Sequence, residues 1–248
     1  MADNPNPEER AGEGLGVVAP PHARLKTKAV LVLTYAAVIL LVDTLAAFAA
    51  SGRPIRGVPI PHFFVVFRWQ FPNGFDLFKF LFWFLIPFLW SLPSLDWRYF
   101  GLGRWKRVDR ILFPVFLAVG LLSLTLIPHI PSLRSTYHGM GYLSATQKWQ
   151  YAQIQLLWTL SWLLGWEFLH RYALLRSVAA AWPRFGWLLV PLAEGLYHLQ
   201  KPPLEALGMV VFSVLACRWT MSRKNILLPF GVHLAIELGL VAYLLVAL

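Results

Sequence analysis

The chain has 248 residues, of which 58% are hydrophobic and only 14% are charged. Soluble domains carry about 25% charged residues, so this composition excludes an ordinary soluble domain. The net charge of +10 comes from Lys and Arg residues that flank apolar segments, which indicates orientation in a membrane rather than binding to nucleic acid. The single cysteine, Cys217, excludes an internal disulfide and a cysteine-rich metal site.

The first 25 residues are polar and rich in Pro, Gly and Glu, and we interpret them as a disordered cytoplasmic tail. Residues 26–248 are expected to form one membrane-embedded domain. The first apolar run, 29–50, is longer than the roughly 7–15 residues of a signal-peptide core. We therefore expect a retained transmembrane helix there rather than a cleaved signal.

The later apolar segments predict an all-α polytopic bundle of about seven spans, each near the roughly 20 residues that a bilayer requires. Residues 62–69 are aromatic and are expected at the interface rather than across the membrane. The positive-inside rule predicts a cytoplasmic N-terminus. We expect the membrane to be a bacterial inner membrane. The further spans are expected at 77–92, 111–127, 153–175, 185–199, 204–218 and 226–248.

Two charged residues lie deep in apolar sequence in the N-terminal half, and we interpret both as structural. Asp43 is expected to pair with a neighbouring helix. Lys79 is near the end of a span and is expected to extend its ammonium group to the interface.

The C-terminal half places polar pairs on three successive apolar segments. Glu167 and Arg171, Glu194 and His198, and His233 and Glu237 are each four residues apart. At that spacing the two members of a pair share one face of a helix. Charges inside a membrane are costly, so three such pairs predict a shared polar site, with buried structural ion pairs as the alternative.

The pattern of these residues limits the chemistry. No His-Glu-x-x-His zinc motif is present, and 167–170 is the only Glu-x-x-His copy, where a di-iron centre needs two. Glycine-rich phosphate loops and Gly-x-Ser-x-Gly elbows are also absent. A glutamate with two histidines suits activation of water and stabilisation of an oxyanion. We expect no cofactor and assign no metal ligands, although two intramembrane histidines permit a metal.

Glu167-x-x-x-Arg171, then His198 late in the next helix, then His233-x-x-x-Glu237 resembles the CPBP family of glutamic intramembrane proteases, over about residues 150–245. The resemblance implies hydrolysis of a peptide bond in a membrane-associated protein or peptide. It implies that Glu167 and His198 activate water and that Arg171 orients Glu167. His233 and Glu237 would stabilise the oxyanion.

Two positions depart from the family pattern. The first motif usually has two adjacent glutamates, and here Trp166 stands in the first position. The last motif often has Asn where this chain has Glu237. Glu205, which follows the Lys-Pro-Pro turn, is a candidate for the missing carboxylate or simply a helix-start residue. The competing hypotheses are a catalytically inactive scaffold or regulator and a small transporter with a proton relay.

Overall fold

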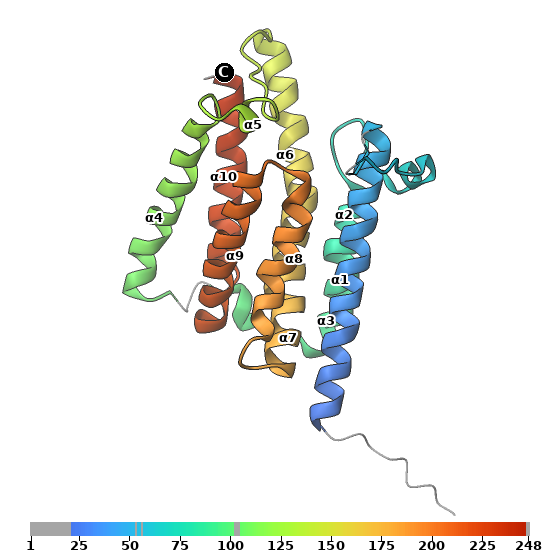
Figure 1. The fold of residues 1–248 in the computed structure, drawn as a ribbon. Helices are drawn as coiled ribbons and strands as arrows, with labels where there is room; N and C mark the ends of the chain where they lie inside the picture. The colour runs from blue at the N-terminus through green and yellow to red at the C-terminus, as the bar shows by residue number, and fades with distance from the viewer. Residues whose placement is uncertain (1–20, 53, 56, 102–104, 247–248) are drawn as a thin grey trace, which may run out of the picture.

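The computed structural model describes residues 21–52, 54–55, 57–101 and 105–246, and its regular elements are helices packed as a bundle (Figure 1). The predicted all-α polytopic class is therefore confirmed. The main helices are α1 (Pro21–Ser51), α4 (Arg107–Ser123), α6 (Ala145–Glu167), α8 (Leu189–Tyr197), α9 (Pro203–Arg223) and α10 (Leu227–Val246). The short ones are α2 (Leu77–Lys79), α3 (Ile86–Ser91), α5 (Pro131–Arg134) and α7 (Leu175–Ala181).

Two π-helical segments join shorter helices into longer continuous ones. Residues Phe80–Leu85 connect α2 to α3, and Phe168–Leu174 connect α6 to α7. The second π-helix begins directly after Glu167 and contains Arg171. π-Helical turns are rare and occur often at functional sites, so this one marks the region around Glu167 for inspection.

Five helices within the described residues are long and apolar enough to cross a membrane. They correspond to the predicted spans at 29–50, 77–92, 111–127, 204–218 and 226–248. The predicted span at 153–175 lies in the continuous α6–α7 run, whose first half carries several glutamines. The predicted span at 185–199 contains α8, which has only 9 residues and is flanked by 3₁₀ turns. Both segments still pack in the bundle.

The outward face of the bundle is apolar, as contact with lipid requires. On α4 the side chains of Ile111, Val119 and Leu122 are 61–66% exposed. Exposure of such a continuous apolar face to water is unfavourable, whereas its contact with lipid acyl chains is not. Together with the long apolar helices, this surface identifies an integral membrane protein.

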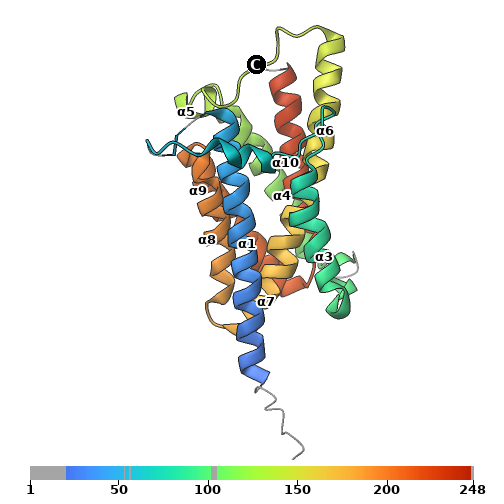
Figure 2. The ribbon, with the colours of Figure 1, turned by 90° about the vertical axis from the view of Figure 1, so that its right-hand side faces the viewer.

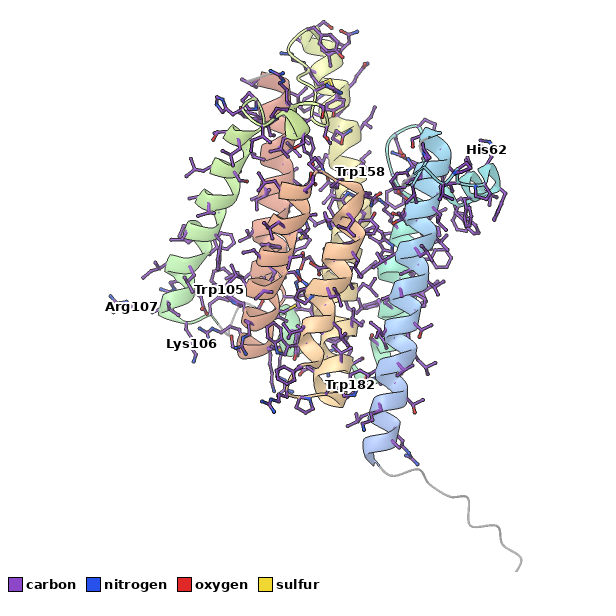
Figure 3. The ribbon with its side chains drawn as sticks, viewed as in Figure 1. His62, Trp105, Lys106, Arg107, Trp158 and Trp182 are labelled. Carbon is purple, nitrogen blue, oxygen red and sulfur yellow. The ribbon has the colours of Figure 1, made fainter. Side chains whose placement is uncertain are left out.

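The loops alternate between the two ends of the bundle. Helices α1 and α4 begin, and α7 and α9 end, at the same end, as the two perpendicular views agree (Figures 1 and 2). Lys106, Arg107 and Trp182 lie at this end, and His62 lies at the other (Figure 3). The start of α1 and the described residues that join the other helices at this end thus lie on one side of the bundle. Which side of the membrane this end faces stays a prediction.

The N-terminal boundary differs from the predicted one. Helix α1 begins at Pro21, within the segment expected to be a disordered tail. Residues 1–20 of that predicted tail lie outside the described residues. The predicted interfacial segment contains a 3₁₀ helix, His62–Phe67, packed against α1.

Close helix packing positions the central helix α6. Gly165 faces the π-helix that contains Trp83, and a Cβ atom added there would lie 2.8 Å from Trp83 Cβ and 3.0 Å from the Phe84 nitrogen. Only glycine allows this approach. The capping box of Ser144 and Gln147 fixes the other end of α6, where each side chain bonds to the backbone N–H of the other residue.

Candidate functional site

The carboxylate of Glu167 contacts the imidazole of His233 across the bundle. Glu167 is the last residue of α6, and its Oε1 lies 2.8 Å from His233 Nδ1. Both residues are buried. On the opposite edge of the ring, His233 Nε2 lies 3.8 Å from Glu237 Oε1. The imidazole therefore lies between two carboxyl groups, that of Glu167 on its Nδ1 side and that of Glu237 on its Nε2 side.

Arg171 forms a two-bond ion pair with Glu194 on α8. Arg171 Nη1 donates to Glu194 Oε1, and Nη2 donates to Oε2 at 2.9 Å. Arg171 Nη1 also donates to Ser213 Oγ on α9 at 3.3 Å. Paired, bidentate contacts of this kind are the usual way to keep buried charges in a core. Arg171 thus connects three helices.

The contact between Arg171 and Glu167 is weaker than the one with Glu194. Arg171 Nε lies 3.5 Å from Glu167 Oε2, and neither atom makes a hydrogen bond within the described part of the chain. The two groups therefore interact electrostatically, and the role of Arg171 in orienting Glu167 stays a prediction. Its hydrogen bonds orient Glu194 instead.

His198 and Glu194 do not pair through their side chains, although their spacing predicts a shared face. His198 Nδ1 lies 2.8 Å from the backbone oxygen of Glu194. The reason is local: α8 ends at Tyr197, and His198 begins a 3₁₀ turn from which its ring folds back onto the preceding carbonyl. Because a carbonyl only accepts, Nδ1 carries the proton, and Nε2 of the neutral ring is left as an acceptor.

Trp166 occupies the space beside His198. The two ring centroids are 5.5 Å apart with an interplanar angle of 82°. Trp166 is buried and also contacts the rings of Trp83, Tyr197 and His170. The position at which the family pattern has its first glutamate therefore holds an aromatic ring packed against the histidine.

A cavity of about 370 Å³ brings several of the predicted residues together. Its walls include His198, His233, Glu237, Glu205 and Trp166. Glu167, Arg171 and Glu194 do not line it. Glu167 instead contacts His233, and Trp166 adjoins His198. The implied activation of water by Glu167 together with His198 stays a prediction. Adjacent residues of a helix point about 100° apart, so Glu167 cannot replace its neighbour.

The cavity has a second polar wall that the sequence analysis assigned to structure alone. Tyr197 donates its hydroxyl hydrogen to Asp43 Oδ2 at 2.6 Å, and Lys79 Nζ lies 3.6 Å from the same oxygen. The predicted partner for Asp43 is thus present. Lys79 does not extend to the interface; it is buried and paired with Asp43. The sequence signal for the contact between Asp43 and Lys79 was the presence of two opposite charges within apolar segments.

Glu205 has a partner that no sequence pattern indicated. Tyr137, in the loop between α5 and α6, donates its hydroxyl hydrogen to Glu205 Oε2 at 2.7 Å. Lys201 Nζ lies 3.8 Å from Glu205 Oε1. Burial and the Glu205 carboxylate raise the pKa of Tyr137, so the phenol stays a donor. Glu205 is thus held at the cavity wall with one hydrogen bond and one nearby cation.

The donor set of the cavity does not form a metal centre. Within the described ranges, no group of three or more His, Cys, Asp and Glu side chains is arranged to hold a metal ion. The arrangement provides one imidazole nitrogen that accepts, a second imidazole that contacts a carboxylate, and the carboxyl groups of Asp43, Glu205 and Glu237 on the wall.

The fold and the site define a polytopic membrane protein with a histidine- and glutamate-lined cavity inside its helix bundle. Residues 147–239 match the family model described as type II CAAX prenyl endopeptidase Rce1-like. This region is thus similar to the CPBP family, and the resemblance that the motifs indicate is confirmed over residues 147–239. Neither a curated protein nor a solved structure matches the chain.

Proposed function

We propose that this protein is an intramembrane endopeptidase that hydrolyses a peptide bond of a membrane-associated protein or peptide. The observation that carries the proposal is the single cavity lined by His198, His233 and Glu237. The name of the matched family points to prenylated C-terminal tails as one substrate class. The roles of individual residues follow from the hydrogen bonds each ring nitrogen makes.

His198 would act as the general base. Its Nδ1 hydrogen bonds to the Glu194 carbonyl, which leaves Nε2 able to accept a proton from a water molecule in the cavity. The water oxygen would attack the peptide carbonyl carbon as the proton moves to Nε2. The same proton would then pass to the amide nitrogen as the C–N bond breaks, which gives a carboxylic acid and an amine. The carboxylic acid, which keeps the second proton of the water, would then lose that proton to solvent water.

His233 would stabilise the oxyanion. The Glu167 carboxylate at 2.8 Å from Nδ1 favours the protonated ring, whose Nε2–H then faces the cavity as a donor. Glu237 in its protonated form would be the second donor on this wall. Glu167 is thus proposed as a positioning residue that acts through His233, with Arg171 nearby. Glu205 would be a further carboxylate of the binding wall.

The inactive scaffold is the second candidate, and Trp166 is the observation that favours it. A ring beside His198 replaces the carboxylate that would assist a base. In that case the cavity would bind a membrane peptide without cleaving it. The two candidates predict different effects of the same substitutions on processing.

The test is a proteomic comparison of the protein N-termini in membranes from cells that carry the wild type or one variant at matched abundance. We expect precursors to accumulate with His198→Ala, His233→Ala and Glu237→Gln. His129→Ala is the matched control, because His129 is exposed and does not line the cavity. If all variants process every protein as the wild type does, the endopeptidase proposal fails and the scaffold stands.

A further inference from the structure

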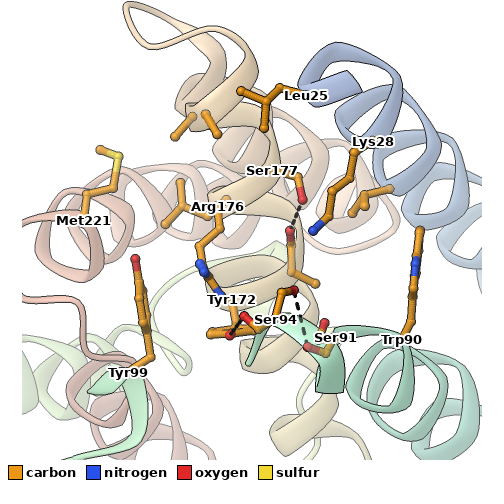
Figure 4. A pocket seen from close by; sticks show the side chains of 15 residues that line it. Leu25, Lys28, Trp90, Ser91, Ser94, Tyr99, Tyr172, Arg176, Ser177 and Met221 are labelled. Atoms are coloured by element: carbon orange, nitrogen blue, oxygen red, sulfur yellow. Dashed lines mark hydrogen bonds between the residues drawn. The ribbon is translucent and has the colours of Figure 1, made fainter. Parts of the chain in front are cut away.

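A second cavity, of about 460 Å³, lies at the end of the bundle at which α1 begins (Figure 4). Its walls come from the first turns of α1, from the segment that follows α3, and from the π-helix and α7. It shares no lining residue with the cavity that contains His198 and His233. This cavity therefore needs an explanation of its own.

Two cations face into this space from opposite walls. Lys28 belongs to α1 and Arg176 to α7, and Figure 4 shows both side chains directed into the cavity. Neither forms a salt bridge within the described part of the chain. Among the residues that the structure describes, no acidic side chain lines the cavity. The described wall of the cavity is thus positively charged.

The carboxylate of Asp96 interacts electrostatically with Arg176 but forms its ion pair with Arg98. Asp96 accepts two hydrogen bonds from Arg98, at 2.7 Å from Nε and 2.8 Å from Nη2. These bonds lower the pKa of Asp96 to about 2, so the carboxylate is charged and forms an ion pair with Arg98. Arg176 is consequently available to an external anion.

Aromatic rings fix the position of the Arg176 guanidinium. Its Cζ lies 4.5 Å from the ring centroid of Tyr172 and 5.2 Å from that of Tyr99. Stacked guanidinium groups keep their N–H donors free at the edges, where they bind phosphate oxygens well. Trp90 and the two tyrosines also suit the headgroup level of a bilayer, at which Trp and Tyr are enriched.

We propose that this cavity binds the phosphate-bearing headgroup of an anionic lipid. Lys28 and Arg176 would contact the phosphate oxygens, and the hydroxyls of Ser91 and Ser94 line the same space. The apolar side chain of Leu25 forms another part of the wall, against which the start of an acyl chain would lie. Basic pockets between transmembrane helices are the usual sites for anionic headgroups.

The test is thermal unfolding of the full chain purified in a neutral detergent, with phosphatidylglycerol, phosphatidylcholine or inorganic phosphate added. We expect phosphatidylglycerol to raise the midpoint in a concentration-dependent way, and the other two to have little effect. Lys28→Gln should weaken the apparent affinity for phosphatidylglycerol about fivefold, since each basic residue near the surface contributes about that factor.

Matched controls separate a site from general surface charge. Lys26→Gln changes the same charge on the same helix but outside the cavity, and Arg184→Gln does so beyond α7. Both should bind as the wild type does. Because Lys28 is exposed, Lys28→Gln keeps the test informative even if Arg176→Gln unfolds the protein.

Three outcomes would overturn the proposal. Equal shifts with phosphatidylglycerol and phosphatidylcholine would show that negative charge is not selected. An equal shift with inorganic phosphate would assign the cavity to a free anion instead of a lipid. An affinity that falls as much in Lys26→Gln as in Lys28→Gln would show that the charge of the whole end, and not the cavity, attracts the lipid.

Discussion

The indole ring of Trp166 meets the imidazole of His198 edge to face, with centroids 5.5 Å apart and planes at 82°. Trp166 also packs between Trp83 and Tyr197, so it joins the histidine to the aromatic core. The ring therefore limits how far the imidazole can rotate. Together with the contact between Nδ1 and the Glu194 carbonyl, the ring holds the orientation of His198.

Replacement of Trp166 tests whether the ring positions His198. Trp166→Ala should cost about 3–5 kcal/mol in the free energy of unfolding, as large-to-small changes of buried aromatics do. We also expect lower processing per folded molecule, because the imidazole gains freedom. Trp166→Phe keeps a ring and removes an indole N–H that has no partner among the described residues, so it should preserve most of both properties.

Unfolding in SDS and processing at matched abundance measure the two effects separately. If Trp166→Ala processes substrate as fast per folded molecule as Trp166→Phe, the ring only fills space and does not position His198.

The ion pair between Arg171 and Glu194 should contribute strongly to stability because both partners are fully buried. Glu194→Ala leaves a buried guanidinium without its carboxylate and is expected to cost about 3–5 kcal/mol in the free energy of unfolding. Asp96→Ala, which breaks an ion pair with the largely exposed Arg98, should leave stability unchanged within error. Unfolding curves in SDS check both. Equal stability of the two variants would contradict the burial argument.

The close approach of α6 to the π-helix predicts a glycine-specific effect. Gly165→Ala places a methyl group against Trp83 and the Phe84 backbone, which should destabilise the fold by about 1–3 kcal/mol. Gly208 on α9 has open space around its added Cβ, so Gly208→Ala should stabilise by up to about 1 kcal/mol through helix propensity. Thermal midpoints of the two variants should move in opposite directions; a shift of the same sign would refute the packing account.

Cys217 should report on unfolding of the bundle. It is the only cysteine, it is fully buried, and Arg171 lies 3.6 Å from its sulfur. We expect a membrane-permeant maleimide to label it only when the bundle opens, and much faster in Glu194→Ala than in the wild type. Ser123→Cys, at an exposed position, gives the labelling rate of an accessible thiol. Rapid labelling of Cys217 in the native wild type would contradict the described packing.

The sequence by itself determined the class, the main helices and the polar residues of the site. Charged groups are costly in lipid, so they are scarce in the spans and cluster at the ends of the apolar segments. This pattern can be recognised from the sequence alone. The spacing of four residues likewise placed His233 and Glu237 on one face, because helix geometry is local.

Only the tertiary structure decided how these residues pair. Glu167 contacts His233 rather than His198, Arg171 bonds to Glu194 on another helix, and Tyr137 reaches Glu205 from a loop. Such contacts depend on the rotation of each helix about its axis and on where α8 ends, and both are set by packing between helices. Helical periodicity fixes the face a residue shares with its neighbours, but the partner helix that this face meets is a property of the whole bundle.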